Sequence, residues 1–155
     1  GAGSVYFAPA SPGDIAAVEL DNDGLVIQKD GFLACTEEVH VNTQIQNLAQ
    51  GIFSGEGFFI LKAEGRGLVF LESYGAIHRL DLGPGEQKIV DNGHLVAWSR
   101  HMDYRLESAS IGIVAAFTSG EAIVCRFTGP GTVYVQTRQA RQFGIWISRF
   151  LPGGK

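Results

Sequence analysis

The chain has 155 residues, of which 45% are apolar and 18% are charged, so it can bury a sizeable core and is not a disordered segment. Its formal net charge of −4 provides no general positive field for a phosphate backbone, which argues against nucleic-acid binding. With 21 glycines and a single methionine, the composition is typical of a turn-rich β protein of one domain.

Short runs in which apolar and polar residues alternate predict β-strands along most of the chain. In order, they cover residues 5–8, 15–20, 39–41, 68–71, 104–106 and 132–136. Two denser apolar runs, 58–61 and 111–117, are typical of strands buried on both faces. Asp23-Gly24, Asp30-Gly31 and Asn92-Gly93 predict type I′ hairpins, and Pro84-Gly85 and Pro130-Gly131 predict turns. The pattern therefore predicts an all-β sandwich, barrel or prism.

The chain also repeats itself. Residues 1–8 (GAGSVYFA) return as 65–72 (GRGLVFLE) and as 129–136 (GPGTVYVQ), each time after 64 residues, and 13–20 match 75–82 at an offset of 62. A fixed period indicates one structural unit used several times. We expect a single domain over residues 1–155, with a partial repeat at 1–12, repeats at 13–74 and 75–137, and a helix at 138–151. Because the first copy is cut, we expect the natural protein to have further sequence upstream.

After Thr137 the apolar residues are spaced by three and four, which predicts an amphipathic helix over residues 138–151. Its apolar face carries Phe143, Trp146 and Phe150. We expect this face to plug an open barrel end or to cover a sheet edge. Attachment to a membrane surface or to a partner is the less favoured alternative. The polar face consists of Arg138, Arg141, Gln142 and Arg149.

Cys35 and Cys125 are the two cysteines, and both lie in apolar, strand-like runs at different points of the repeat. This placement favours small buried side chains over a disulfide or a zinc site. Thiols kept in reduced form suit a reducing compartment, so we expect a cytoplasmic location.

A duplicated Ser-Gly-Glu triplet makes Glu56 and Glu121 candidates for a pair of catalytic carboxylates. A catalytic pair needs two different environments to separate the acid from the base, whereas two copies of one repeat position have similar surroundings. We therefore interpret both as structural side chains that accept backbone N–H groups at a glycine turn. Together with His94, they remain candidates for lining a small-molecule pocket.

Other patterns that carry chemistry are missing from the sequence. The histidines do not show the close His-x-His spacing of β-barrel metalloenzymes. There is no Gly-x-Ser-x-Gly nucleophile elbow, and no glycine-rich loop leads into a helix that could bind a phosphate. We predict no catalytic residue, no metal ion and no cofactor. The four histidines are His40, His78, His94 and His101.

Four segments carry a family resemblance: 53–57 (FSGEG), 73–75 (SYG), 91–97 (DNGHLVA) and 129–138 (GPGTVYVQTR). Together they resemble the altered-inheritance-of-mitochondria (mitochondrial biogenesis) family, formerly a domain of unknown function. The resemblance implies a fold like that of the tryptophan RNA-binding attenuation protein, a short double-stranded β-helix or β-prism unit repeated three times in one chain. It implies no biochemical activity, because none is established for the bacterial members.

The function that these observations favour is non-enzymatic: a scaffold or binding protein that acts through self-association or a protein partner. The alternative is a small-molecule-binding or hydrolytic β-helix protein. RNA binding would follow from the fold analogy alone, and the acidic net charge argues against it.

Overall fold

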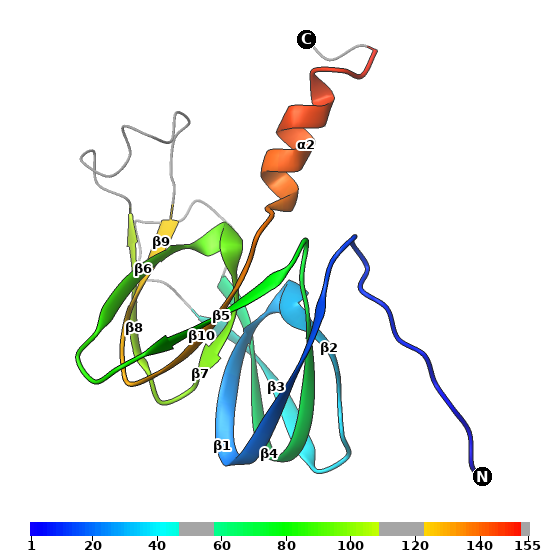
Figure 1. The fold of residues 1–155 in the computed structure, drawn as a ribbon, viewed down its shortest axis with the longest axis vertical. Coiled ribbons are helices and arrows are strands. Elements are labelled where there is room, and N and C mark those ends of the chain that lie inside the picture. Colours follow the sequence, from blue (N-terminus) through cyan, green and yellow to red (C-terminus); the bar gives the residue numbers. More distant parts are fainter. Residues whose placement is uncertain (47–57, 109–122, 153–155) are drawn as a thin grey trace.

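The computed structural model describes residues 1–46, 58–108 and 123–152, which form ten β-strands, two 3₁₀ turns and one α-helix. Figure 1 shows two β lobes side by side, with the helix rising away from both. The prediction of an all-β fold with one helix near the C-terminus is confirmed. The elements are β1 (Ile15–Gln28), η1 (Lys29–Gly31), β2 (Phe32–Cys35), β3 (Val39–Gln46), β4 (Phe58–Glu72), β5 (Ile77–Leu82), β6 (Gln87–Asp91), η2 (Asn92–His94), β7 (Leu95–Ser99), β8 (Asp103–Ser108), β9 (Ile123–Thr128), β10 (Gly131–Gln136) and α2 (Ala140–Ser148).

The first lobe, β1 to β4, is built on two long antiparallel strands. β1 pairs with β4 over most of its length, with an irregularity between Asp21 and Gly24. The shorter strands β2 and β3 both pair with β4. Alternation places Leu20, Val69 and Leu71 inside, so this lobe has a core of its own.

The second lobe, β5 to β10, continues the same sheet and adds another. β7 pairs with the end of β1 and with β10, and β10 pairs with β5, which gives the strand order β2-β4-β1-β7-β10-β5. β6, β9 and β8 form a separate three-stranded sheet. This order ends at β2 and at β5, and β3 pairs with β4 outside it.

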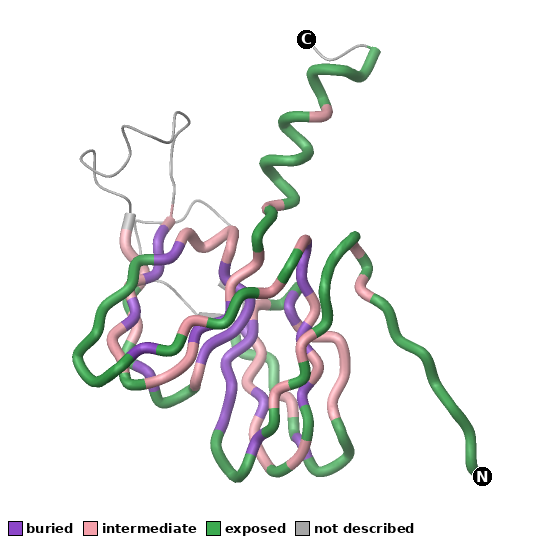
Figure 2. Tube along the Cα trace, viewed as in Figure 1, coloured by how far each residue is buried: buried purple, intermediate pink, exposed green. Residues whose placement is uncertain are grey.

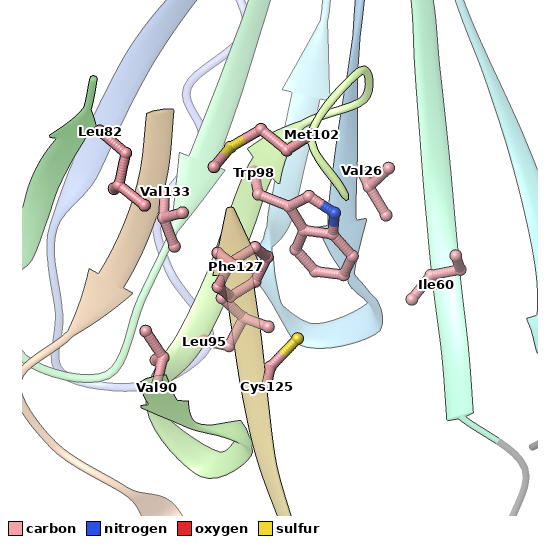
Figure 3. Close-up of a cluster of buried hydrophobic side chains, with 10 residues drawn as sticks. All are labelled: Val26, Ile60, Leu82, Val90, Leu95, Trp98, Met102, Cys125, Phe127 and Val133. Atoms are coloured by element: carbon pink, nitrogen blue, oxygen red, sulfur yellow. The ribbon is translucent and has the colours of Figure 1, made fainter. Parts of the chain in front are cut away.

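Each lobe contributes side chains to the core of the other. The second-lobe core is centred on Trp98 and Phe127, and it also contains Val26 and Ile60 from the first lobe (Figure 3). β10 lies between the two cores, because its alternate side chains face opposite ways. In return, the second lobe contributes three side chains to the first-lobe core: Val96, Ala97 and Tyr134.

The two lobes pair corresponding strands in the same register. Residues 15–20 of β1 pair with 67–72 of β4, and residues 77–82 of β5 pair with 131–136 of β10. These positions are 62 and 64 residues apart, which are the offsets seen in the sequence. The division into repeats and the likeness to the attenuation protein stay predictions.

All the predicted strands in the described ranges are present except the first. Residues 5–8 form no strand: the segment before Ala10 extends away from the body, and Val5, Tyr6 and Phe7 are exposed (Figure 2). Residues 5–8 correspond in sequence to parts of β4 and β10. Those parts pair with β1 and β5, the first strands of their lobes, whereas no described strand pairs with residues 5–8. The predicted strand at 111–117 lies outside the described residues.

The predicted type I′ hairpins are wrong. Asp23-Gly24 lies at the irregularity inside β1, while Asp30-Gly31 and Asn92-Gly93 lie in the 3₁₀ turns η1 and η2. At η2 the Asp91 carboxylate accepts the Gly93 N–H at 2.7 Å. Such a local side-chain bond offers the backbone an alternative to the hairpin turn.

The predicted helix is present but shorter, and its expected packing is wrong. α2 spans nine residues, and none of them is buried. Phe143, Trp146 and Phe150 are 43%, 53% and 69% exposed, so they neither plug a barrel nor cover a sheet edge. The preceding residues explain this position: Thr137 and Arg138 donate their N–H groups to the carbonyls of Ala76 and Tyr74, and α2 begins only beyond that junction.

Candidate functional site: the groove at the base of α2

A groove lies where α2 leaves the body of the protein, and we call it the aromatic groove. It encloses about 360 Å³ and draws its walls from three elements: the β4–β5 junction, η2 and the start of α2. Its lining residues are Tyr74, His94, Thr137, Arg138, Gln139, Gln142, Phe143 and Trp146.

Three aromatic rings line one wall, and with Phe150 beyond the groove they form a continuous series of four, which we call the aromatic stack. Tyr74 at the base meets Phe143 edge-on at 5.9 Å between ring centroids, and Phe143 stacks on Trp146 at 5.8 Å. Trp146 then contacts Phe150 at 5.1 Å. Of the four rings only that of Tyr74 is buried, so the stack runs from the body out along the helix.

The base of the groove depends on Gly75. Its φ of +81° lies in the left-handed region, where a side chain is strained. A Cβ at this position would lie 2.9 Å from the Arg138 Cγ, so glycine also allows the segment between β10 and α2 to pass close to the β4–β5 junction. The Arg138 guanidinium lies over the Tyr74 ring, 5.9 Å from its centroid. Glycine thus lets the arginine and the aromatic ring meet.

The floor is held by a polar network around Gln136. Its amide oxygen accepts the Tyr74 N–H at 2.9 Å, and its amide nitrogen donates to the Gly93 carbonyl at 3.0 Å. His94 Nδ1 lies 2.8 Å from the Gln136 carbonyl oxygen. A carbonyl only accepts, so Nδ1 carries the proton in this contact and Nε2 is the free nitrogen of a neutral ring.

The polar groups around the groove are largely engaged in local hydrogen bonds. Among the described residues, those that line the groove include His94 and Arg138 as basic groups and no carboxylate. The nearby Asp91 carboxylate already accepts from Gly93 and lies 3.5 Å from the Gln139 amide nitrogen. The Thr137 hydroxyl accepts the Ala76 N–H, so it is engaged in the junction. What the groove offers is an aromatic surface with a cation at its base.

The polar side of α2 is cationic. Arg138, Arg141 and Arg149 are exposed, and none belongs to an ion pair formed among the described residues. The sequence after Glu121 contains no Asp or Glu. The helix therefore joins an exposed aromatic face to a positive charge that no described carboxylate balances.

Two other concave surfaces lie on the first lobe, and both are polar. One contains Arg100, whose guanidinium pairs with Glu64 at 2.7 Å. The other is acidic, and its Arg66 pairs with Asp21 at 3.3 Å. Both ion pairs join exposed side chains, so solvent already satisfies these groups. Neither surface has an aromatic wall.

The predicted site residues divide into three groups. Phe143, Trp146 and Phe150 are brought together in the aromatic stack. His94 lies in the aromatic groove, half-buried and bonded to the backbone. Glu56 and Glu121 lie outside the described residues, so the small-molecule pocket that they would form with His94 stays a prediction.

Sequence reasoning missed Tyr74 and Arg138 as partners in one site. Ser73-Tyr74-Gly75 stands out in the sequence as a motif, but a turn motif does not show which distant segment crosses it. The contact follows from the hydrogen bonds that join the β4–β5 junction to the end of β10. Only the tertiary structure brings these two segments, 62 residues apart, together.

Two further features are absent from the described ranges. No group of three or more His, Cys, Asp or Glu side chains there is arranged to hold a metal ion. No described helix is long and apolar enough to cross a membrane.

Comparison with known proteins gives a consistent result. The chain is 33% identical over 153 residues to the uncharacterized protein M6_Spy0233 of Streptococcus pyogenes, covering 98% of this chain and 61% of that protein. The crystal structure of protein SPYM3_0169 from Streptococcus pyogenes superposes with a TM-score of 0.77 at 33% identity, covering 93% of this chain and 63% of the other. The chain thus spans about three fifths of these relatives. Residues 1–138 match the family described as mitochondrial biogenesis AIM24, and the chain belongs to that family.

Proposed function

We propose that the protein is a non-enzymatic scaffold that acts through self-association. A second copy of the chain packs on the outer face of the β1–β4 pair, where β1 presents Ile15 and Ala17 and β4 presents Leu68 and Phe70. We call this surface the sheet face.

The observation that supports this proposal is a difference between the two lobes. Tyr134 on β10 lies opposite Arg79, and its side chain is 8% exposed because it packs into the first-lobe core. Phe70 has the corresponding place on β4, opposite Ala17, but it belongs to neither core. The same sheet position is thus buried in a core in one lobe and only half-buried in the other.

The rest of the sheet face is mixed: Ile15 lies opposite Glu72, and Leu68 lies opposite Glu19. Ile15 is 42% exposed and Leu68 is 37% exposed, on adjacent strands. The face continues to β2, an end of the strand order, and an edge strand can accept further backbone pairing. A second copy can cover this surface as the first lobe covers Tyr134 of the second lobe within one chain.

The test is the oligomeric state in solution, measured by sedimentation velocity over a range of protein concentrations. We expect the wild-type chain to associate. The double variant Ile15→Glu/Leu68→Glu should be monomeric, because it places two charges in the contact without removing a buried side chain. Its fold is checked by circular dichroism and thermal unfolding.

Trp146→Glu on α2 is the matched control, and it should associate like the wild type. A wild-type chain that stays monomeric at every concentration would contradict the proposal. So would association that Ile15→Glu/Leu68→Glu leaves unchanged, or that Trp146→Glu abolishes, since the contact would then lie elsewhere.

A further inference from the structure

We propose that α2 is an interfacial anchor that binds an anionic lipid surface. The three exposed rings of the aromatic stack, Phe143, Trp146 and Phe150, enter the headgroup region, and Arg138, Arg141 and Arg149 meet the lipid phosphates. This inference goes beyond the scaffold proposal and uses a different surface, so either can fail without the other.

The first argument is the exposure of a large apolar face. Phe143, Trp146, Ile147 and Phe150 are spaced at i, i+3, i+4 and i+7, which places them on one side of the helix. None of them is buried, although burying each would be favourable. Tyr74 at the base provides the one ring contact between this face and the described body. Ile145 is the apolar residue on the opposite side.

The second argument is charge. Residues 138–155 contain four cationic residues and no acidic one, so they carry +4 in a chain whose total is −4, and residues 1–137 carry −8. The partner that complements such a segment is an anionic surface. An amphipathic helix with arginines on one side and Trp and Phe on the other is the usual composition of a helix that lies in a membrane interface.

The third argument is the position of the helix. α2 rises away from both lobes, with its far end at a distance from the body (Figure 1). The acidic lobes are therefore not forced against a negatively charged surface when the helix lies on it. The length of α2 agrees with this role, because the nine-residue helix lies in an interface and is too short to span a bilayer.

A single-stranded nucleic acid is the other anionic partner, and the ring geometry disfavours it. Base stacking needs free aromatic faces. Phe143 and Trp146 stack on each other with an angle of 30° between their planes, and Trp146 also contacts Phe150. The rings thus occupy part of one another's faces, while their outer edges join Ile147 in a surface suited to hydrocarbon.

The experiment uses vesicles of equal parts phosphatidylcholine and phosphatidylglycerol, with pure phosphatidylcholine vesicles for comparison. Co-sedimentation measures binding, and tryptophan emission measures insertion. Trp98 is fully buried whereas Trp146 is half-exposed, so a blue shift on adding vesicles reports on Trp146. We expect binding and a blue shift with the anionic vesicles, both weakened by salt.

Two variants separate the contributions of the two sides of the helix. Trp146→Glu should lower the partition onto anionic vesicles by about tenfold or more, because it removes the central ring and adds a negative charge. Arg141→Glu/Arg149→Glu should lower it while leaving the aromatic face intact. Val5→Glu is the control, since it makes the same apolar-to-acidic change at an exposed site away from α2, and it should bind like the wild type.

Four results would overturn the proposal. They are no binding of the wild type to anionic vesicles, binding that Trp146→Glu leaves unchanged, an equal loss with Val5→Glu, and a blue shift that single-stranded oligonucleotide or raised protein concentration produces without lipid. The last would assign α2 to a nucleic acid or to a second copy. Sedimentation of the same variants without vesicles keeps this outcome separate from failure of the scaffold proposal.

Discussion

The two tryptophans of this chain differ sharply in burial. Trp98 contacts Tyr104 and Phe127 edge-on and is fully buried, and its indole Nε1 has no hydrogen-bond partner among the described residues. An unpaired buried donor has a cost, so the packing of the surrounding rings must outweigh it. Trp146 lies in the open, where its indole can meet solvent or a surface.

Cys125 shows what burial does to a titratable group. Removal from water raises the pKa of its thiol to about 12, with a smaller contribution from the negative charge of Glu107. We expect Cys125 of the folded protein to be nearly inert toward a thiol reagent such as DTNB, because the thiolate is the reacting species. Cys35, which is half-buried, should react first, and Cys125 should react only on unfolding.

The same shift predicts an effect of alkaline pH on stability. Above the ordinary pKa of 9.0 the unfolded thiol ionises while the folded one stays protonated, so stability should fall as pH rises from 9.0 toward about 12. Urea unfolding of wild type and Cys125→Ala across this window tests the prediction. If Cys125→Ala lost as much stability over this pH range as the wild type, the prediction would be contradicted. Cys35→Ala is the control, and it should lose as much as the wild type.

At the scale of the elements, every strand that regular alternation predicted in the described ranges is present except residues 5–8, and so is the turn at Pro84-Gly85, whereas the type I′ hairpins were wrong. The strand at 15–20 could be predicted because its side chains alternate between a core and solvent. Asn92-Gly93 was predicted as a hairpin, because the sequence does not show that the Asp91 side chain takes up the Gly93 N–H. The helix was predicted from its spacing, but spacing cannot reveal whether its apolar face meets a core or open space.

α2 contains a glycine at a position that does not require one. A Cβ at Gly144 would meet nothing within 4 Å. Gly144→Ala should therefore stabilise the helix by about 1 kcal/mol, because alanine loses less backbone entropy in a helix. Hydrogen exchange of the α2 amides and far-UV circular dichroism measure the gain.

Gly85→Ala is the matched comparison for this change. A Cβ at Gly85 also has open space, but the φ of +75° is left-handed. The same methyl group should there destabilise the fold by about 1 kcal/mol. Equal effects of the two substitutions would show that backbone conformation does not control the outcome.

At the scale of the whole molecule, the two lobes are joined by shared cores rather than by a linker. Ile60 of the first lobe is fully buried in the second-lobe core with Trp98. We expect Ile60→Ala to lower the free energy of unfolding by about 2–5 kcal/mol. The loss should occur in one transition, seen alike by tryptophan emission and by far-UV circular dichroism during urea unfolding.

The control for this change is Ile89→Ala, an exposed position on β6, which should alter stability by no more than about 0.5 kcal/mol. Two separate transitions in the wild type, with only one affected by Ile60→Ala, would mean that the lobes unfold independently.

The candidate site was predictable only in its parts. The spacing in the tail pointed to Phe143, Trp146 and Phe150, and His94 was singled out as a pocket residue. Their meeting with Tyr74 and Arg138 depends on hydrogen bonds between the β4–β5 junction and the end of β10, which no local pattern encodes. The family assignment also came from motifs in order along the chain, and it leaves the activity open.

The exchange of buried side chains between the lobes also constrains how the sequence can evolve. A substitution at Val26 or Ile60 changes the space around Trp98, and one at Tyr134 changes the space around the first-lobe residues. Neither lobe can therefore accumulate core substitutions on its own. If the lobes arose by duplication, the two copies have had to diverge together, each adapting to the other at these few positions.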